Sequence, residues 1–217
     1  MKKILSILAA AMTLLVTACD GHKDFPDASM KVGDIVCTDG NVLPWDKYEQ
    51  SDKKAIAVVF HINRNEDVEG YGYAVYLYDI APEAFCDSIG VEQGTSADIT
   101  AYDGNMNTFA LYDTKEVSSP LAERVFDLWR YGQSAYIPSV AQLRLLYQVR
   151  EAVNHYITKC GGTPIPDDDD YCWYWSSTEV EGQETAKAWL YSLGSGAMQE
   201  TPKWQSHQAR PIITLNE

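Results

Sequence analysis

The stretch from Tyr171 to Thr178 constrains the fold of this chain most strongly. Its sequence is Tyr-Cys-Trp-Tyr-Trp-Ser-Ser-Thr, and such a density of aromatic and hydroxyl-bearing residues favours a pleated, half-buried strand over a helix. Strand alternation puts Trp173 and Trp175 on one face and Tyr174 on the other. Acidic residues precede the stretch and a polar turn follows it. We therefore expect a short strand with sharp ends, packed against a core.

Two amphipathic helices are predicted before this strand. The first starts at Ser118-Ser119-Pro120, because serine caps helices and proline suits the first turn. The second starts at Ser139, where Gln142 completes a capping box, and it ends at Gly161-Gly162. Apolar residues recur at helical spacing in both: Leu121, Val125, Leu128 and Trp129 in the first, and Leu143, Leu146, Val149, Val153, Tyr156 and Ile157 in the second.

Short strands are predicted on both sides of these helices, so the fold class is α+β with antiparallel sheets. Residues 80–111 contain several glycines and many polar residues, which indicates loops and short elements. The strands expected before the helices are Val32–Cys37, Ala55–Ile62 and Tyr71–Tyr78, and those expected after them, besides the aromatic strand, are Ala186–Leu193, Ala197–Glu200 and Ala209–Leu215.

The first 18 residues have the pattern of a signal peptide. Met1-Lys2-Lys3 is basic, and the apolar run from Ile4 to Val16 has about thirteen residues, too few to span a bilayer, which takes roughly twenty. Val16-Thr17-Ala18-Cys19 resembles the processing site of bacterial lipoproteins. That resemblance implies acyl chains on Cys19 and a stable membrane anchor. The alternative is an ordinary signal peptide cleaved nearby, with Cys19 incidental.

The rest of the chain is predicted to form a tether and one folded unit. Residues 19–30 are polar and lack periodicity, which is typical of a linker between the bilayer and a domain. Residues 31–217 are expected to fold as a single α+β domain. We expect this domain at the cell envelope, held to the outer membrane or displayed on the cell surface.

The composition argues against nucleic acid as a partner. The chain has 31 acidic and 17 basic residues, a formal net charge of -14. No stripe of Lys and Arg interrupts this acidity, so binding to a phosphate backbone is not expected.

Four cysteines besides Cys19 form an even set in an exported chain, which favours two disulfides. Three pairings are open. We expect Cys160 with Cys172, the closest in sequence, and Cys37 with Cys86. A zinc site is the rival interpretation, and the sequence has no Cys-x-x-Cys pair to favour it.

Other side chains are candidates for binding. The acidic run of Asp167, Asp168, Asp169 and Asp170 is a weak calcium candidate, although a solvated acidic loop is the preferred interpretation. Aromatic residues stack on sugar rings but also fill cores. The ligand-binding candidates are Trp175, Trp189, Trp204 and His207, and the last two lie in a polar stretch that favours exposure.

Catalytic motifs are not found in the sequence. It has no Gly-x-Ser-x-Gly elbow, no His-Glu-x-x-His and no phosphate-binding glycine loop. We expect neither catalytic residues nor a cofactor.

Several short motifs, in order, resemble one known family. Residues 117–215 are similar to the C-terminal domain family first named from bacterial collagen-like adhesins, whose fold is similar to C-type lectins and formylglycine-generating enzymes. The resemblance implies that fold and a tendency toward adhesion. The calcium-binding triplets of such lectins and the reactive cysteine pair of such enzymes are absent from this sequence. The matching motifs are Tyr136-Ile137-Pro138-Ser139, Trp173 to Thr178, Ala188-Trp189, Ser195-Gly196 and Ala209-Arg210-Pro211-Ile212.

The sequence therefore leaves three functional hypotheses. The leading one is a non-enzymatic, lipid-anchored, adhesin-like module that binds a glycan or a surface protein. The alternative is a structural or accessory subunit of a fimbria-like surface assembly. A formylglycine-generating type of enzyme is the remote alternative.

Overall fold

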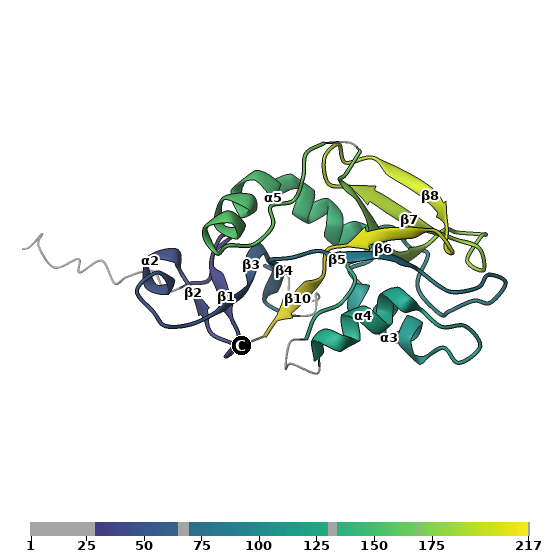
Figure 1. Cartoon of the computed structure of the whole chain (residues 1–217), viewed down its shortest axis with the longest axis horizontal. Coiled ribbons are helices and arrows are strands. Elements are labelled where there is room, and N and C mark those ends of the chain that lie inside the picture. Colours follow the sequence, from purple (N-terminus) through teal and green to yellow (C-terminus); the bar gives the residue numbers. More distant parts are fainter. Residues whose placement is uncertain (1–28, 65–69, 130–133, 169, 217) are drawn as a thin grey trace, which may run out of the picture.

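The computed structural model describes residues 29–64, 70–129, 134–168 and 170–216. The predicted signal peptide, Cys19 and most of the predicted tether lie outside these ranges. Two five-stranded sheets form the body of the molecule (Figure 1). The first sheet has the order β10-β4-β3-β1-β2, and every neighbouring pair in it is antiparallel. Its strands are β1 (Ile35–Cys37), β2 (Val42–Leu43), β3 (Ala55–Ile62), β4 (Gly72–Tyr76) and β10 (Ile212–Leu215).

The second sheet has the order β5-β9-β6-β7-β8. Its pairs are antiparallel except β6 with β9, which run parallel and meet at Tyr174 and Gln208. The consecutive strands β9 and β10 belong to different sheets. The strands of this sheet are β5 (Ile80–Ala84), β6 (Trp173–Glu179), β7 (Lys187–Ser192), β8 (Met198–Pro202) and β9 (Ser206–Ala209).

Helices cover both faces of the first sheet. Helix α5 (Val140–Lys159) lies above the strands in Figure 1, whereas α4 (Pro120–Trp129) and α3 (Gly104–Asp113) lie below them. A short helix, α2 (Trp45–Tyr48), lies at the opposite end of the molecule from β7 and β8. None of the helices within the described ranges is long and apolar enough to cross a membrane.

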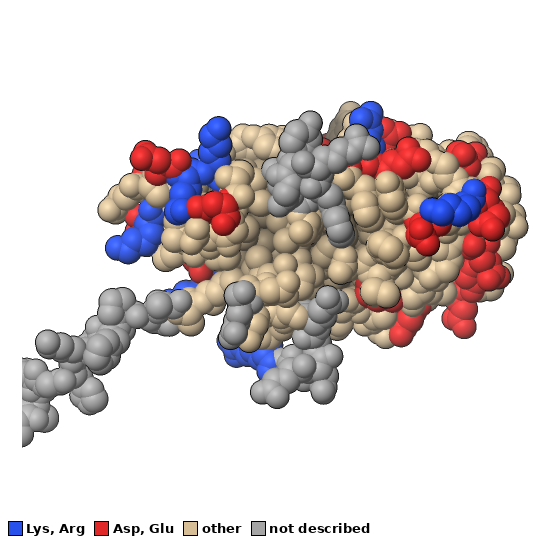
Figure 2. Space-filling model, turned by 90° about the horizontal axis from the view of Figure 1, so that it is seen from below, with Lys and Arg blue, Asp and Glu red and all other residues tan. Residues whose placement is uncertain are grey.

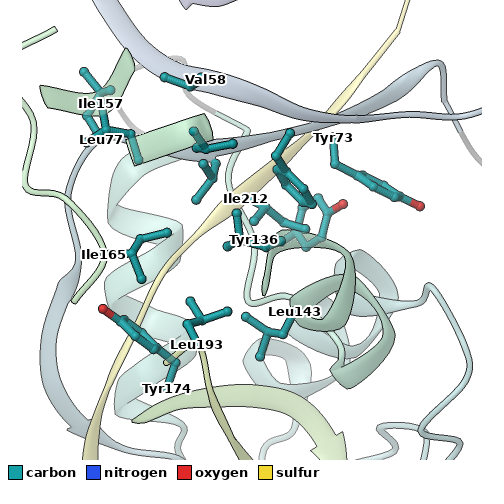
Figure 3. Close-up of a cluster of buried hydrophobic side chains, with 14 of the residues drawn as sticks. Val58, Tyr73, Leu77, Tyr136, Leu143, Ile157, Ile165, Tyr174, Leu193 and Ile212 are labelled. Carbon is teal, nitrogen blue, oxygen red and sulfur yellow. The ribbon is translucent and has the colours of Figure 1, made fainter. Parts of the chain in front are cut away.

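The side chains of β3 alternate between the two faces of the first sheet, and both faces are apolar, so a helix is needed to cover each face. Val58 and Phe60 belong to the buried cluster under α5, and Ala57 and Val59 belong to the cluster on the α4 side. A central strand that is apolar on both faces must be covered on both. Figure 3 shows the α5-side cluster, where Leu143 and Ile157 of α5 lie among strand residues such as Val58 and Ile212.

Both predicted helices are present with their predicted starts. Ser119 Oγ accepts a hydrogen bond from the Ala122 amide at 3.1 Å. Ser139 and Gln142 form the predicted capping box, in which Gln142 Oε1 accepts from the Ser139 amide at 2.9 Å. The α5 exit falls at Gly161, whose φ of +76° is a left-handed conformation that glycine adopts without strain.

The α+β class is confirmed, and the predicted strands are present. The structure bounds β3 as predicted and shows the predicted alternation in β6, with Trp175 on the α4 side and Tyr174 on the α5 side. The sequence did not predict α2, α3, β5 or β9. In residues 80–111 we expected loops and short elements, without assigning any, and the short elements there are β5 and most of α3.

Candidate functional site

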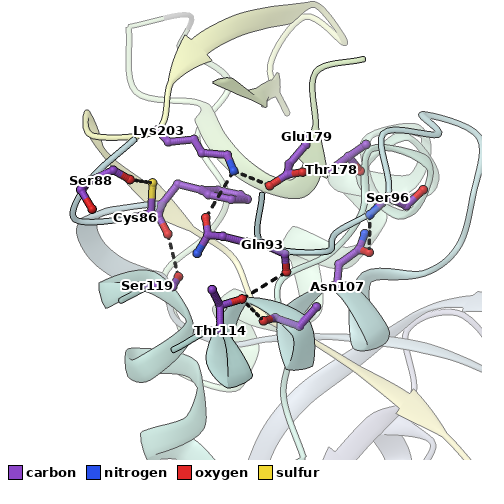
Figure 4. Close-up of polar contacts among 12 residues, drawn as sticks. Cys86, Ser88, Gln93, Ser96, Asn107, Thr114, Ser119, Thr178, Glu179 and Lys203 are labelled. Carbon is purple, nitrogen blue, oxygen red and sulfur yellow. Dashed lines mark hydrogen bonds and ion pairs between the residues drawn. The ribbon is translucent and has the colours of Figure 1, made fainter. Parts of the chain in front are cut away.

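A buried ion pair lies between the second sheet and helix α3. Lys203, in the turn after β8, pairs with Glu179 at the end of β6, and both side chains are at most 1% exposed. Lys203 Nζ also donates to Gln93 Oε1 at 3.3 Å and lies 5.1 Å from the centre of the Phe85 ring. Burial raises the pKa of the Glu179 carboxyl, and the adjacent ammonium opposes that rise. Figure 4 shows the Lys203 side chain reaching Glu179 and Gln93.

A second buried cation, Arg210, joins three segments. Its guanidinium donates to the carbonyls of Tyr76, Leu77 and Thr163 at 2.7–3.0 Å and pairs with Asp79 at 2.8 Å. Arg210 belongs to the Ala-Arg-Pro-Ile motif, so the motif now has a structural explanation. The arginine donates to carbonyls at the end of β4 and in the loop after α5, and buried backbone carbonyls need such donors.

Neither buried cation has the access that catalysis requires. Lys203 and Arg210 are 0% exposed, so a substrate in solvent cannot touch them. Buried ion pairs of this kind are costly to break and hold elements in place. We assign both a structural role.

An aromatic groove opens on the second sheet. It has a volume of about 280 Å³. Tyr171 is 68% exposed beside it, and Trp173 and His207 form part of its wall. Gln208 Nε2 donates to the Tyr171 carbonyl at 2.5 Å, which ties the segment before β6 to β9. Its remaining lining residues are Pro82, Asp170, Leu190, Gln199 and Ser206.

The chemistry of this aromatic groove suits binding. Aromatic faces beside amides and hydroxyls are the groups that stack on and orient sugar rings. Hydrolysis of a glycoside takes two opposed carboxyl groups, whereas the described lining has one, that of Asp170. Burial against Trp175, whose ring lies 5.3 Å away and edge-on, lowers the pKa of His207 below its usual 6.5.

A second, acidic groove of about 640 Å³ lies around Trp189. Carboxylates from Asp98, Glu181, Glu184 and Glu200 line it. Glu200 pairs with Lys187 at 3.0 Å, and this ammonium lowers the pKa of the carboxyl. The described residues contain no set of three ligands arranged to hold a metal ion.

The four predicted ligand-binding residues lie at different places in the structure, one in the core and three at the surface. Trp175 is fully buried and packs edge-on against Phe85, so it is a core residue. Its indole Nε1 donates to the Glu83 carbonyl at 3.1 Å. His207 lines the aromatic groove, Trp189 lines the acidic groove, and Trp204 is 58% exposed on the turn between β8 and β9. Tyr171 was not predicted as a ligand-binding residue, although its place beside the acidic run is a polar setting typical of exposed residues.

The predicted disulfides are not formed. Cys37, Cys86, Cys160 and Cys172 are all thiols in the structure. The members of each expected pair have different surroundings: Cys37 and Cys160 belong to the cluster around α5, whereas the Cys172 thiol lies 3.0 Å from Ser192 Oγ and that of Cys86 lies 2.8 Å from the Ser88 carbonyl. Burial raises the pKa of Cys86 and of Cys160 to about 11.

The acidic run forms a turn before β6. Asp168 accepts hydrogen bonds from the amides of Asp170 and Tyr171 at 2.9 and 3.0 Å. Asp167, Asp168 and Asp170 are exposed, and Asp169 lies outside the described residues. Calcium binding there stays a prediction.

Comparison with known proteins gives one informative likeness. No family model matches the chain, and no curated protein matches it. Its structure is similar to that of a fimbrial protein from Bacteroides ovatus, with a TM-score of 0.65 and 18% sequence identity. The match covers 85% of this chain and 49% of that protein, so the chain spans about half its length. At this identity the likeness establishes a shared fold.

Proposed function

We propose that this protein is a non-enzymatic subunit or accessory of a fimbria-like assembly on the cell surface. The observation that carries the proposal is the likeness to a fimbrial protein over 85% of the chain. The buried position of Lys203 and Arg210 supports a non-enzymatic role, because the two most distinctive charged groups serve packing. The adhesin-like hypothesis has less support than this alternative.

The proposal includes lipid attachment at Cys19. It rests on the sequence resemblance to lipoprotein processing sites. Metabolic labelling with an alkyne-bearing palmitate is the test, and we expect label on the native chain and none on Cys19→Ala. Cys160→Ala is the matched control and keeps its label. Label on Cys19→Ala would refute the anchor.

Loss of the protein should change the assembly itself. We expect a deletion strain to display fewer or shorter surface filaments in electron micrographs, with recovery when the wild-type chain is restored. Filaments of unchanged number and length in the deletion strain would exclude a subunit role in building them.

Glycan binding at the aromatic groove is the second candidate function, favoured by the exposed Tyr171 beside Trp173. It agrees with the C-type-lectin-like resemblance of residues 117–215, which also stands as a proposal. A glycan array on the purified protein is the test. Binding that disappears in Tyr171→Ala and persists in Trp204→Ala supports this groove, and a blank array on the wild type excludes it.

A further inference from the structure

Helix α3 carries its largest apolar side chains on its outer face. Met106 is 67% exposed, Phe109 is 55% exposed and Tyr112 is 46% exposed. This distribution reverses that of an ordinary surface helix, whose apolar side chains face the core. The buried residues of α3 are Gly104, Asn107, Thr108 and Leu111, of which two have polar side chains.

Polar contacts fix α3 in this orientation. Asn107 Oδ1 accepts a hydrogen bond from the Ser96 amide at 2.9 Å. Thr108 Oγ1 accepts one from the Ile137 amide at 2.9 Å. Turning the helix to bury Phe109 would break both contacts and leave buried polar groups unpaired, which is costly. The exposure of the apolar face is therefore built into the fold.

The apolar face continues into a groove between α3 and α4. Tyr112 stacks on Phe126 of α4, with ring centroids 3.9 Å apart and planes 12° from parallel. The groove has a volume of about 900 Å³, and Glu123 and Asp127 also line it. Contiguous exposed apolar surface rimmed by polar groups marks interaction sites, whereas single exposed apolar residues do not.

The rim of this apolar face is acidic. Asp113 ends α3 and Glu116 follows it, and both are exposed. With Glu123 and Asp127 of α4 they place four carboxylates near the face, and among the described residues the nearby cations are Lys115, which pairs with Asp113 at 3.1 Å, and Arg124, which pairs with Glu83 at 2.9 Å. In the view of Figure 2, acidic side chains predominate at the end of the molecule that holds α3.

From these observations we infer that the outer face of α3, together with the groove beside α4, docks a cationic amphipathic segment of another protein. Apolar residues of that segment cover Met106 and Phe109, and its Lys or Arg residues meet the acidic rim. A second copy of this chain does not fit, because two such faces would bring like-charged rims together. The inference rests on the proposed function in one respect, that a neighbouring subunit supplies the segment.

A short amphipathic peptide of leucine and lysine at helical spacing is the probe. The purified protein is immobilised through a carboxy-terminal tag, and binding is measured by surface plasmon resonance. We expect saturable binding that weakens with salt, and a Kd that rises by ~10-fold or more in Met106→Ser/Phe109→Ser. Trp204→Ser, which removes an exposed aromatic elsewhere, is the matched control and leaves the Kd unchanged. Thermal melting verifies that the variants are folded.

Two further outcomes would overturn the inference. Equal binding to wild type and Met106→Ser/Phe109→Ser would mean that acidity alone attracts the peptide. Sedimentation that shows a wild-type dimer lost in that variant would identify a second copy as the occupant. Recovery of the protein from surface filaments is a separate result, so the docking inference and the proposed function can fail independently.

Discussion

Arg210 and Lys203 are the residues on which the packing of this protein depends most. Each is a fully buried cation with a carboxylate partner, Asp79 for Arg210 and Glu179 for Lys203. Removing one member of a buried pair leaves the other charge unpaired in a medium that solvates it poorly. We therefore expect changes at these residues to act on stability.

Arg210→Met should cost about 3–5 kcal/mol of unfolding free energy. The change leaves Asp79 without its guanidinium and removes one donor from each of the carbonyls of Tyr76, Leu77 and Thr163, of which Leu77 keeps the Thr163 amide. Urea denaturation is the measurement. Arg124→Met is the control, because the Arg124 guanidinium is exposed and its pair with Glu83 should contribute little to stability. Equal costs for the two changes would contradict the structural role of Arg210.

His207 should make stability depend on pH. Burial lowers the pKa of His207 below 6.5 in the folded state, so the unfolded chain takes up the proton first as pH falls. The contribution of His207 to the free energy of unfolding is complete above pH 6.5. It decreases as pH falls below that value, with a slope of at most about 1.4 kcal/mol per pH unit. The stability difference between wild type and His207→Gln should shrink from pH 7.5 to 5.5. Exposed His155, changed to Gln, is the control, and an identical pH response in both variants would contradict this assignment.

The thiols should resist modification in the folded state. Cys37, Cys86 and Cys172 are at most 1% exposed. In native protein without reductant, we expect a maleimide to reach Cys160 first and the other three only after unfolding in urea. Peptide mass mapping is the measurement. Two cysteines that react with the maleimide only after reduction would show that they form a disulfide, and would contradict this prediction.

At the scale of elements, capping decides where α5 begins. Ser139 is fully buried, and its Oγ donates to the Ala101 carbonyl at 2.7 Å besides capping the Gln142 amide. Ser139→Ala should destabilise the protein by about 1–2 kcal/mol in thermal or urea unfolding. Ser118→Ala is the control, since its hydroxyl bonds the exposed Glu123 carboxylate. A cost for Ser139→Ala no larger than that of Ser118→Ala would contradict the cap.

Elements with a strong pattern could be predicted, and those held by tertiary contacts could not. Helix α5 has a capping box and a continuous apolar stripe, and β3 is a continuous apolar strand, so both follow from sequence. Helix α3 buries polar residues and exposes apolar ones, which gives no amphipathic pattern. Strand β5 contains Pro82 at the edge of its sheet, where a missing amide is tolerated but the local sequence favours a loop.

The candidate site was harder to predict than the fold. Trp175 and His207 were both candidates, and only packing distinguishes the buried indole from the groove-lining imidazole. Tyr171 is exposed next to the turn at Asp168, where the Asp170 amide donates to the Asp168 side chain and the Tyr171 amide donates to the Asp168 carbonyl. The burial of Trp175, in contrast, depends on its contacts with Phe85 and the Glu83 carbonyl, which are distant in sequence.

At the scale of the whole molecule, three surfaces remain open to partners. The aromatic groove suits a sugar, the apolar face of α3 suits a cationic segment, and the acidic groove around Trp189 adds to the negative field. The net charge of -14 over the chain favours basic partners and speeds their approach at low salt.

The central claim is membership of a surface assembly, and the composition of sheared filaments tests it most directly. Filaments are removed from intact cells by shear, purified and quantified by mass spectrometry, with an unrelated envelope lipoprotein as the control for contamination. We expect this protein to be enriched in the filaments relative to that lipoprotein, in constant ratio to the filament subunits. Equal recovery of the two proteins, with no enrichment in the filaments, would contradict it.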